Sequence, residues 1–161
     1  MTKPDNNHSE FFPEAVAAKE DKHKKPYLHA SNDIPDKCIL IYDDEPEILF
    51  LCKVILSNSP YRVETLLRCD NVINDIARIQ PDIILMDLSI PEIGGEKAIN
   101  IIKANPATQH IPIIIVSANR EIKEIYKKTK AEDYIEKPFN MAYLKETIAK
   151  TLLKIKSVSG I

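Results

Sequence analysis

A chain of 161 residues is long enough to bury one sizeable core, and 44% hydrophobic with 29% charged residues is typical of a globular protein. The formal net charge of −2 argues against a nucleic-acid binder, which needs a basic surface to neutralise phosphates. The polar start lacks the apolar segment of a signal peptide, and three cysteines without C-x-x-C spacing favour buried thiols in a reducing, cytoplasmic setting.

Residues 1–35 are dominated by polar and charged side chains of both signs and show no sustained apolar period. We expect this segment to be a disordered extension. Its histidines are too widely spaced to predict a metal cluster. The rest is expected to form one domain over residues 36–156, followed by a short tail at 157–161. No apolar run is long enough to cross a membrane, so we expect no membrane insertion.

From Lys37 onward, short apolar runs alternate with segments of helical periodicity. The apolar run 83–86 is bounded by Pro81 and Pro91, which is typical of a strand buried on both faces. Asp87 follows it directly. The predicted strands are, in chain order, 38–42, 61–66, 83–86, 111–116 and 133–137.

Five helices are predicted between and after these strands from their start signals and apolar faces. Pro46 suits a first helical turn, Asp70 and Asn140 are candidate caps, and Gly94–Gly95 opens the third helix. A short, charged fourth helix is expected over residues 120–130. The predicted inward faces of the other four helices are Ile48, Leu51, Cys52, Ile55 and Leu56; Val72, Ile73, Ile76 and Ala77; Ala98, Ile101 and Ile102; and Met141, Leu144, Ile148 and Leu152.

Five strands alternating with five helices predict an α/β fold, with a parallel sheet covered by helices on both faces. Right-handed crossovers leave few topologies for five such units. The expected one is the flavodoxin-like, doubly wound five-stranded sheet of order 2-1-3-4-5.

Polar residues stand at the carboxyl ends of four strands that this order makes neighbours. Asp43 and Asp44 follow the first strand, Asp87 the third, Ser117 the fourth, and Lys137 the fifth. Each alone has an ordinary explanation as a turn, cap or surface residue. Their coincidence at one edge of the sheet, where open α/β sheets bind ligands, indicates a functional site.

The residue types indicate phosphoryl chemistry. Three carboxylates repel one another unless a positive charge lies among them, and an oxygen-rich site suits Mg²⁺ rather than zinc. Lys137 supplies a point charge for a phosphoryl oxygen and Ser117 a hydroxyl donor. A carboxylate can act as the nucleophile and form an aspartyl phosphate.

The chain resembles the receiver domain of bacterial two-component response regulators over residues 37–155. The matching motifs are Tyr-Asp-Asp-Glu at 42–45, Met-Asp-Leu-Ser-Ile-Pro-Glu-Ile-Gly-Gly at 86–95, Val-Ser-Ala at 116–118 and Asp-Tyr-Ile-Glu-Lys-Pro-Phe at 133–139. By this resemblance, Asp87 is the phosphoacceptor. Mg²⁺ is bound by Asp43, Asp44, Asp87 and the backbone carbonyl of Ser89.

The resemblance also implies a switch. Ser117 is its hydroxyl, Lys137 pairs with the phosphate, Tyr134 is the aromatic that turns inward on activation, and a peptide bond that is often cis precedes Pro138. The phosphodonor would be a histidine kinase or a histidine phosphotransfer protein, and the signal would leave through a downstream target protein. The expected protein is a stand-alone receiver, monomeric or weakly dimeric. It is no enzyme beyond its own phosphotransfer and autodephosphorylation.

Several positions depart from the family pattern. Tyr42 replaces a small aliphatic residue, and Gly94–Gly95 replaces an Asp-Gly pair. The segment 66–70 lacks the small residue and glycine that are usual there, and the interval between Ser117 and Lys137 is shorter than usual. None of these changes removes a residue of the predicted site.

Two other functions compete with this interpretation. A small aspartate-based phosphohydrolase also needs a nucleophilic Asp, Mg²⁺, a hydroxyl and a lysine. It normally places the nucleophile after the first strand in an Asp-x-Asp pattern, whereas Asp43 and Asp44 are adjacent. The other candidate is a degenerate receiver that serves only as a binding module, against which the complete set of five site residues argues.

Overall fold

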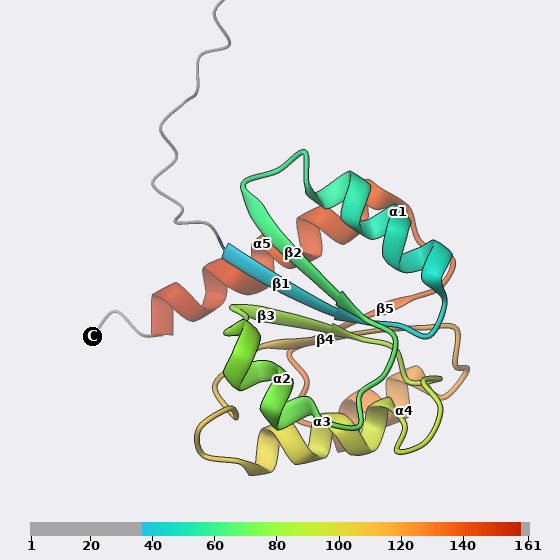
Figure 1. Cartoon of the computed structure of the whole chain (residues 1–161), viewed down its shortest axis with the longest axis vertical. Coiled ribbons are helices and arrows are strands. Elements are labelled where there is room, and N and C mark those ends of the chain that lie inside the picture. Colours follow the sequence, from blue (N-terminus) through green and yellow to red (C-terminus); the bar gives the residue numbers. More distant parts are fainter. Residues whose placement is uncertain (1–36, 159–161) are drawn as a thin grey trace, which may run out of the picture. The chain divides into compact units, whose positions relative to one another are not determined.

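The computed structural model describes residues 37–158, and the predicted extension at 1–35 lies outside the described residues (Figure 1). The elements are β1 Lys37–Tyr42, α1 Pro46–Leu56, β2 Tyr61–Leu66, α2 Val72–Ile79, β3 Ile83–Met86, α3 Gly95–Ala104, β4 Ile113–Ser117, α4 Ile122–Lys128, β5 Asp133–Glu136 and α5 Met141–Val158. All strand pairs are parallel, in the order β2-β1-β3-β4-β5. The predicted flavodoxin-like α/β fold is therefore confirmed.

The sheet lies between two helical layers, with α1 and α5 on one face and α2, α3 and α4 on the other (Figure 1). Residues of β3 are divided between the two cores because successive side chains of a strand point to opposite faces. Ile84 and Met86 pack with α2, α3 and α4, whereas Ile83 and Leu85 pack with α1 and α5. All four are buried, as predicted for a central strand.

The predicted inward faces of three helices were partly wrong. On α1 the buried residues include Leu49, whereas Leu51 is 45% exposed. On α3, Ile99 is buried in place of Ile101. On α2, Ala77 is exposed. Periodicity did not select the correct face of α1 or α3 because apolar residues occur on more than one side of each helix.

The predicted caps had mixed outcomes. Asn140 accepts a hydrogen bond from the N–H of Tyr143 at 2.8 Å, as a capping side chain does. Asp70 does not cap α2: the N-cap position belongs to Asn71, and Asp70 instead accepts a hydrogen bond from Arg68. The fourth helix is short, as expected.

Lysine–carboxylate pairs hold the amino ends of the strands. Asp82 pairs with Lys37 and also accepts the N–H of Cys38 at 2.8 Å, which joins the starts of β3 and β1. Glu132 pairs with Lys103 at 2.7 Å and accepts the N–H of Ile113, which joins the starts of β5 and β4. In each pair one carboxylate oxygen binds the ammonium and the other binds a strand N–H.

The three cysteines are buried, as the sequence predicted. Cys38, Cys52 and Cys69 are all free thiols.

Between residues 37 and 158, no helix combines the length and apolar character needed to cross a bilayer.

Candidate functional site

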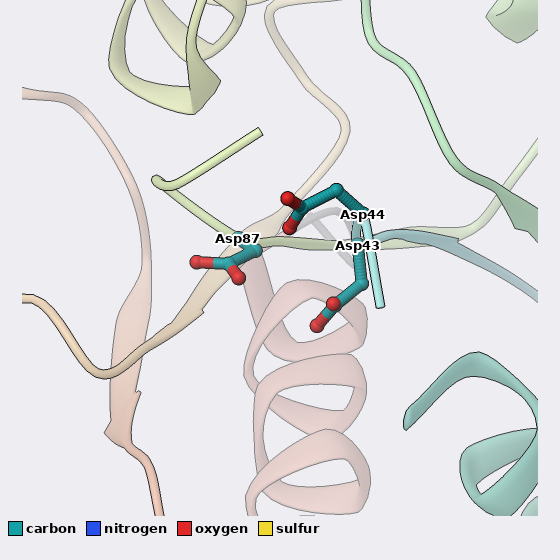
Figure 2. Close-up of side chains that lie close together, drawn as sticks. All are labelled: Asp43, Asp44 and Asp87. Carbon is teal, nitrogen blue, oxygen red and sulfur yellow. The ribbon is translucent and has the colours of Figure 1, made fainter. Parts of the chain in front are cut away.

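Three carboxylates meet where β1 and β3 end (Figure 2). Asp43 and Asp44 directly follow β1, and Asp87 directly follows β3. Because these strands are parallel neighbours, their carboxyl ends lie at the same edge of the sheet. One carboxylate oxygen of each residue lies within 4.8 Å of those of the other two. Asp43 and Asp87 are buried, whereas Asp44 is exposed.

Lys137 places a positive charge among these acids. It directly follows β5, and its Nζ lies 2.7 Å from Asp43 Oδ2 and 2.9 Å from Asp87 Oδ2. A weaker contact of 3.3 Å joins the same Nζ to Glu45 Oε1. The lysine side chain is only 10% exposed, so its pairs with Asp43 and Asp87 are shielded from water.

The remaining oxygens of the two buried carboxylates are fixed by their own loops. Asp43 Oδ1 accepts the N–H of Glu45 at 3.0 Å, and Asp87 Oδ1 accepts the N–H of Ser89 at 3.1 Å. The backbone of Asp87 is also held, because its N–H donates to the carbonyl of Tyr42 at 3.0 Å. Both carboxylates are thus oriented before any ligand arrives.

Burial and charge shift the pKa values at this site. Burial raises the pKa of Asp43, although the hydrogen bonds from Lys137 and the Glu45 N–H oppose it. Burial alone would lower the pKa of Lys137, but the hydrogen bonds and charges of Asp43 and Asp87 outweigh burial and hold this pKa above its ordinary value. Lys137 therefore stays charged at neutral pH.

The first residue of α3, Gly95, packs closely against the backbone of Asp87. A Cβ added at Gly95 would lie 2.0 Å from the carbonyl oxygen of Asp87, so only glycine fits there without a backbone shift. Gly94 has φ +76° and ψ 150°, a conformation that other residues rarely adopt. The two glycines thus serve different purposes, one conformational and one steric.

Two further predicted residues lie on the neighbouring strands β4 and β5. Ser117 ends β4 and is fully buried, and its hydroxyl accepts the N–H of Asn119 at 3.4 Å rather than contacting the carboxylates. Its carbonyl accepts the N–H of Lys137. Tyr134 of β5 is partly buried and packs against Tyr126 of α4, with ring centroids 5.0 Å apart. The Lys137–Pro138 peptide bond is cis.

The acidic cluster fits a hard divalent cation. Three carboxylates contact one ammonium, and Asp44 adds a fourth carboxylate close to Asp43 and Asp87, so the cluster carries surplus negative charge when all are ionised. Carboxylate oxygens with room for water are the ligands that Mg²⁺ prefers. The described residues in this cluster offer only carboxylates and no imidazole or thiolate, which is unlike a zinc site.

Glu45 and Gly95 are two residues of the site that sequence reasoning did not assign. Glu45 was visible only as the last residue of the Tyr-Asp-Asp-Glu motif at 42–45, with no role in the site assigned to it. Its contact with Lys137 joins residues 92 positions apart. Gly95 was noted as a helix start, but its close approach to Asp87 depends on how α3 packs.

Comparisons with known proteins point in one direction. Residues 39–149 match the family model described as the response regulator receiver domain. A probable cyclic di-GMP phosphodiesterase of Vibrio cholerae is 32% identical over 125 residues, which cover 75% of this chain and 28% of that protein. The transcriptional regulatory protein KdpE of Staphylococcus aureus is 38% identical over 117 residues, covering 68% of this chain and 47% of KdpE.

A solved structure shows the same likeness. The receiver domain of the sensor histidine kinase PA1611 from Pseudomonas aeruginosa aligns with a TM-score of 0.67 and 27% identity, covering 73% of this chain and 98% of that domain. That crystal structure contains a magnesium ion coordinated in the active-site cleft. The chain spans about half or less of the length of several curated relatives that it matches.

Proposed function

The chain belongs to the family of response regulator receiver domains, and from that premise we propose that Asp87 accepts a phosphoryl group from a phosphohistidine. The observation that carries the proposal is the contact of Lys137 with Asp43 and Asp87, at 2.7 and 2.9 Å. It holds a positive charge beside the nucleophile in a cluster that is otherwise acidic. The donor would be a histidine kinase or a histidine phosphotransfer protein.

The transfer needs positioning and charge neutralisation more than covalent help from other groups. A carboxylate oxygen of Asp87 attacks phosphorus, and the new O–P bond forms as the P–N bond to the donor imidazole breaks. The electron pair of the P–N bond returns to the imidazole, which is protonated as it leaves. Lys137 then pairs with a phosphoryl oxygen instead of Asp87 Oδ2.

Asp43, Asp44, Asp87 and the backbone carbonyl of Ser89 would hold Mg²⁺. When bound, this ion supplies counter-charge for the phosphoryl oxygens. The protein's own contribution is the orientation of two buried carboxylates by the backbone N–H groups of Glu45 and Ser89. Because these hydrogen bonds already restrict the two carboxylates, the carboxylates lose little conformational freedom when an ion binds.

Phosphorylation would act on a two-state switch. The added charge would draw the Ser117 hydroxyl away from Asn119 and turn Tyr134 from its contact with Tyr126. Both residues lie on the β4–β5 side of the sheet, so the change would spread to the face formed by α4, β5 and α5. A downstream target protein would bind this face, or the phosphoryl group would pass onward in a relay.

The proposal is tested by incubating the full chain with Mg²⁺ and acetyl phosphate and measuring its mass. We expect the mass of one added phosphoryl group, and none with Asp87→Asn. Asp75→Asn serves as the matched control, because Asp75 is a carboxylate on α2 that pairs with Tyr42 and Arg78. It should label like the wild type.

Two outcomes would support the competing functions. A folded wild-type chain that gains no mass would contradict phosphoacceptor activity and favour a receiver that only binds partners. Continuous release of phosphate from p-nitrophenyl phosphate at high turnover would favour a phosphohydrolase.

A further inference from the structure

An arginine joins the two loops that lie on either side of the Asp43–Asp44 pair. Arg68 lies in the loop between β2 and α2, and its Nε donates to Asp70 Oδ2 at 2.8 Å. Its Nη2 lies 2.8 Å from Oε1 of Glu92, in the loop between β3 and α3. The guanidinium is planar, so two carboxylates at its Nε and Nη2 fix its direction.

Glu92 lies in the loop that follows Asp87 and has an unusual backbone conformation. Its φ of 73° is in the left-handed region, which is costly for a residue with a side chain. The same loop contains Ser89, whose N–H holds Asp87 Oδ1, and Ile90, whose side chain is buried. The ion pair with Arg68 therefore acts on the one turn that links the nucleophile to α3.

The sheet order places this ion pair around the acidic cluster. Because β1 lies between β2 and β3, the loops that carry Arg68 and Glu92 are on opposite sides of the residues that follow β1. The backbone already ties these segments together, since the Asp43 N–H donates to the Leu66 carbonyl at 3.2 Å. Arg68 completes a connection from the end of β2 to the loop after β3.

We propose that Arg68 is a positioning residue of the metal site, acting through Glu92 on the conformation of the loop 88–94. This inference rests on the proposed function, because the loop is argued to contribute the Ser89 carbonyl to Mg²⁺. It also gives a role to the segment 66–70, which departs from the family pattern and which the phosphoryl chemistry does not use.

The ion pair is placed to select a loop conformation rather than to stabilise the fold. The side chains of Arg68 and Glu92 are 57% and 55% exposed, and exposed pairs contribute little to the free energy of unfolding. Its loss should therefore leave the melting temperature almost unchanged. The loss should instead appear in the affinity for metal, since Mg²⁺ must then select the correct loop conformation from several.

The experiment is an NMR titration of the full chain with MgCl₂, comparing the wild type with Arg68→Ala. We expect about three- to tenfold weaker Mg²⁺ binding, less than the about 10–100-fold typical of groups that contact a metal ligand directly. Glu92→Gly should weaken binding similarly, because glycine adopts the positive φ but cannot bind Arg68. The double variant should bind no more weakly than either single variant, and Arg68→Lys should restore part of the affinity.

Lys127→Ala is the matched control, because Lys127 forms an exposed ion pair with Glu124 on α4. It should bind Mg²⁺ like the wild type. Unchanged affinity of Arg68→Ala, or additive losses in the double variant, would overturn this inference alone, provided that the wild type binds Mg²⁺. A wild-type chain that binds no Mg²⁺ would overturn the proposed function and this inference together.

Discussion

Lys103 and Lys137 are both largely buried lysines that pair with carboxylates, but they lie at opposite ends of the parallel sheet. At the amino end, Lys103 Nζ donates to Glu132 at 2.7 Å and to the carbonyls of Ile111 and Gln109 at 2.9 and 3.3 Å. One ammonium thus meets one carboxylate, and neutral carbonyls complete its hydrogen bonds. This end is electrostatically balanced.

At the carboxyl end, one ammonium serves several acids. Lys137 contacts Asp43, Asp87 and Glu45, while Asp44 adds a further carboxylate to the cluster. The surplus negative charge at the carboxyl end favours a bound cation. The pair at the amino end has no net charge and does not attract one. Lysine and carboxylate side chains therefore stabilise the fold at one end of the sheet and form a candidate site at the other. The number of carboxylates for each lysine distinguishes the two ends.

The largest expected effect is on the balanced end. Lys103→Met should lower the free energy of unfolding by about 3 kcal/mol, because it leaves Glu132 and two carbonyls without their buried partner. Urea unfolding followed by circular dichroism measures this change. Mg²⁺ affinity of the folded variant should stay at the wild-type value.

Lys127→Met is the control for this substitution, because Lys127 is 67% exposed and pairs with Glu124. Its effect should stay within about 0.5 kcal/mol. If Lys103→Met were equally mild, the pair at the amino end would not be structural, and the contrast between the two ends would fail.

The next effect concerns Gly94 and Gly95, which fix the backbone near Asp87 at the carboxyl end of the sheet. Gly95→Ala should cost about 2–3 kcal/mol, because its Cβ would collide with the backbone carbonyl of Asp87. Gly94→Ala should cost about 1–2 kcal/mol through its positive φ alone, since its Cβ would meet open space. Urea unfolding gives both values, and acetyl phosphate labelling separates the causes.

Labelling should slow markedly in Gly95→Ala, because the collision displaces Asp87, and only slightly in Gly94→Ala. An equal loss of labelling in both variants would show that the conformation of the loop, rather than contact with Asp87, is what the glycines provide.

Whether the sequence predicts a contact at either end of the sheet depends on how the contact is formed. Asp43, Asp87 and Lys137 each directly follow a strand, so topology alone predicts that their side chains meet. Contacts between residues that do not end neighbouring strands do not follow from topology. The pairs Lys103–Glu132, from α3 to the loop before β5, and Arg68–Glu92, between two loops, both depend on how far the side chains reach across the finished fold.

Helix orientation was the other limit. On α1, apolar residues from Ile48 to Leu56 occur almost all round the helix, so the period fits a face with Leu51 as well as the observed face with Leu49. Packing against the sheet selects the face with Leu49. On α3 the observed face includes the buried ammonium-bearing Lys103, which a search for apolar residues cannot select.

The third prediction uses the metal to distinguish the two ends. Mg²⁺ at ten times its dissociation constant should raise the free energy of unfolding by about 1.4 kcal/mol, because the ion binds only the folded chain. Asp43→Asn should abolish most of this increase, since a carboxylate of the cluster is lost. Asp82→Asn, at the amino end, should lower stability but keep the full increase.

Thermal unfolding with Mg²⁺, and with EDTA as the metal-free reference, measures these differences. An increase that survives Asp43→Asn unchanged would place the ion elsewhere than in the acidic cluster.

The smallest effect concerns local opening at the two ends, reported by buried thiols. Burial raises the pKa of Cys69 to about 11 and also raises that of Cys38, so at pH 8 neither thiol reacts unless the surrounding structure opens. The unfolded thiol of Cys69 ionises first as pH rises past about 9, so the stability that this buried thiol contributes is complete below that pH and declines toward pH 11.

Alkylation with iodoacetamide at pH 8 should therefore modify Cys69 before Cys38. Cys69 lies in the loop between β2 and α2, whereas Cys38 is held in β1 between two hydrogen-bonded neighbouring strands. Local opening is easier in loops than in central strands, and a difference of about tenfold in rate is expected. Peptide mass spectrometry resolves the two sites. Faster modification of Cys38 would mean that the balanced amino end, and not the acidic end, is the part of the sheet that opens more readily.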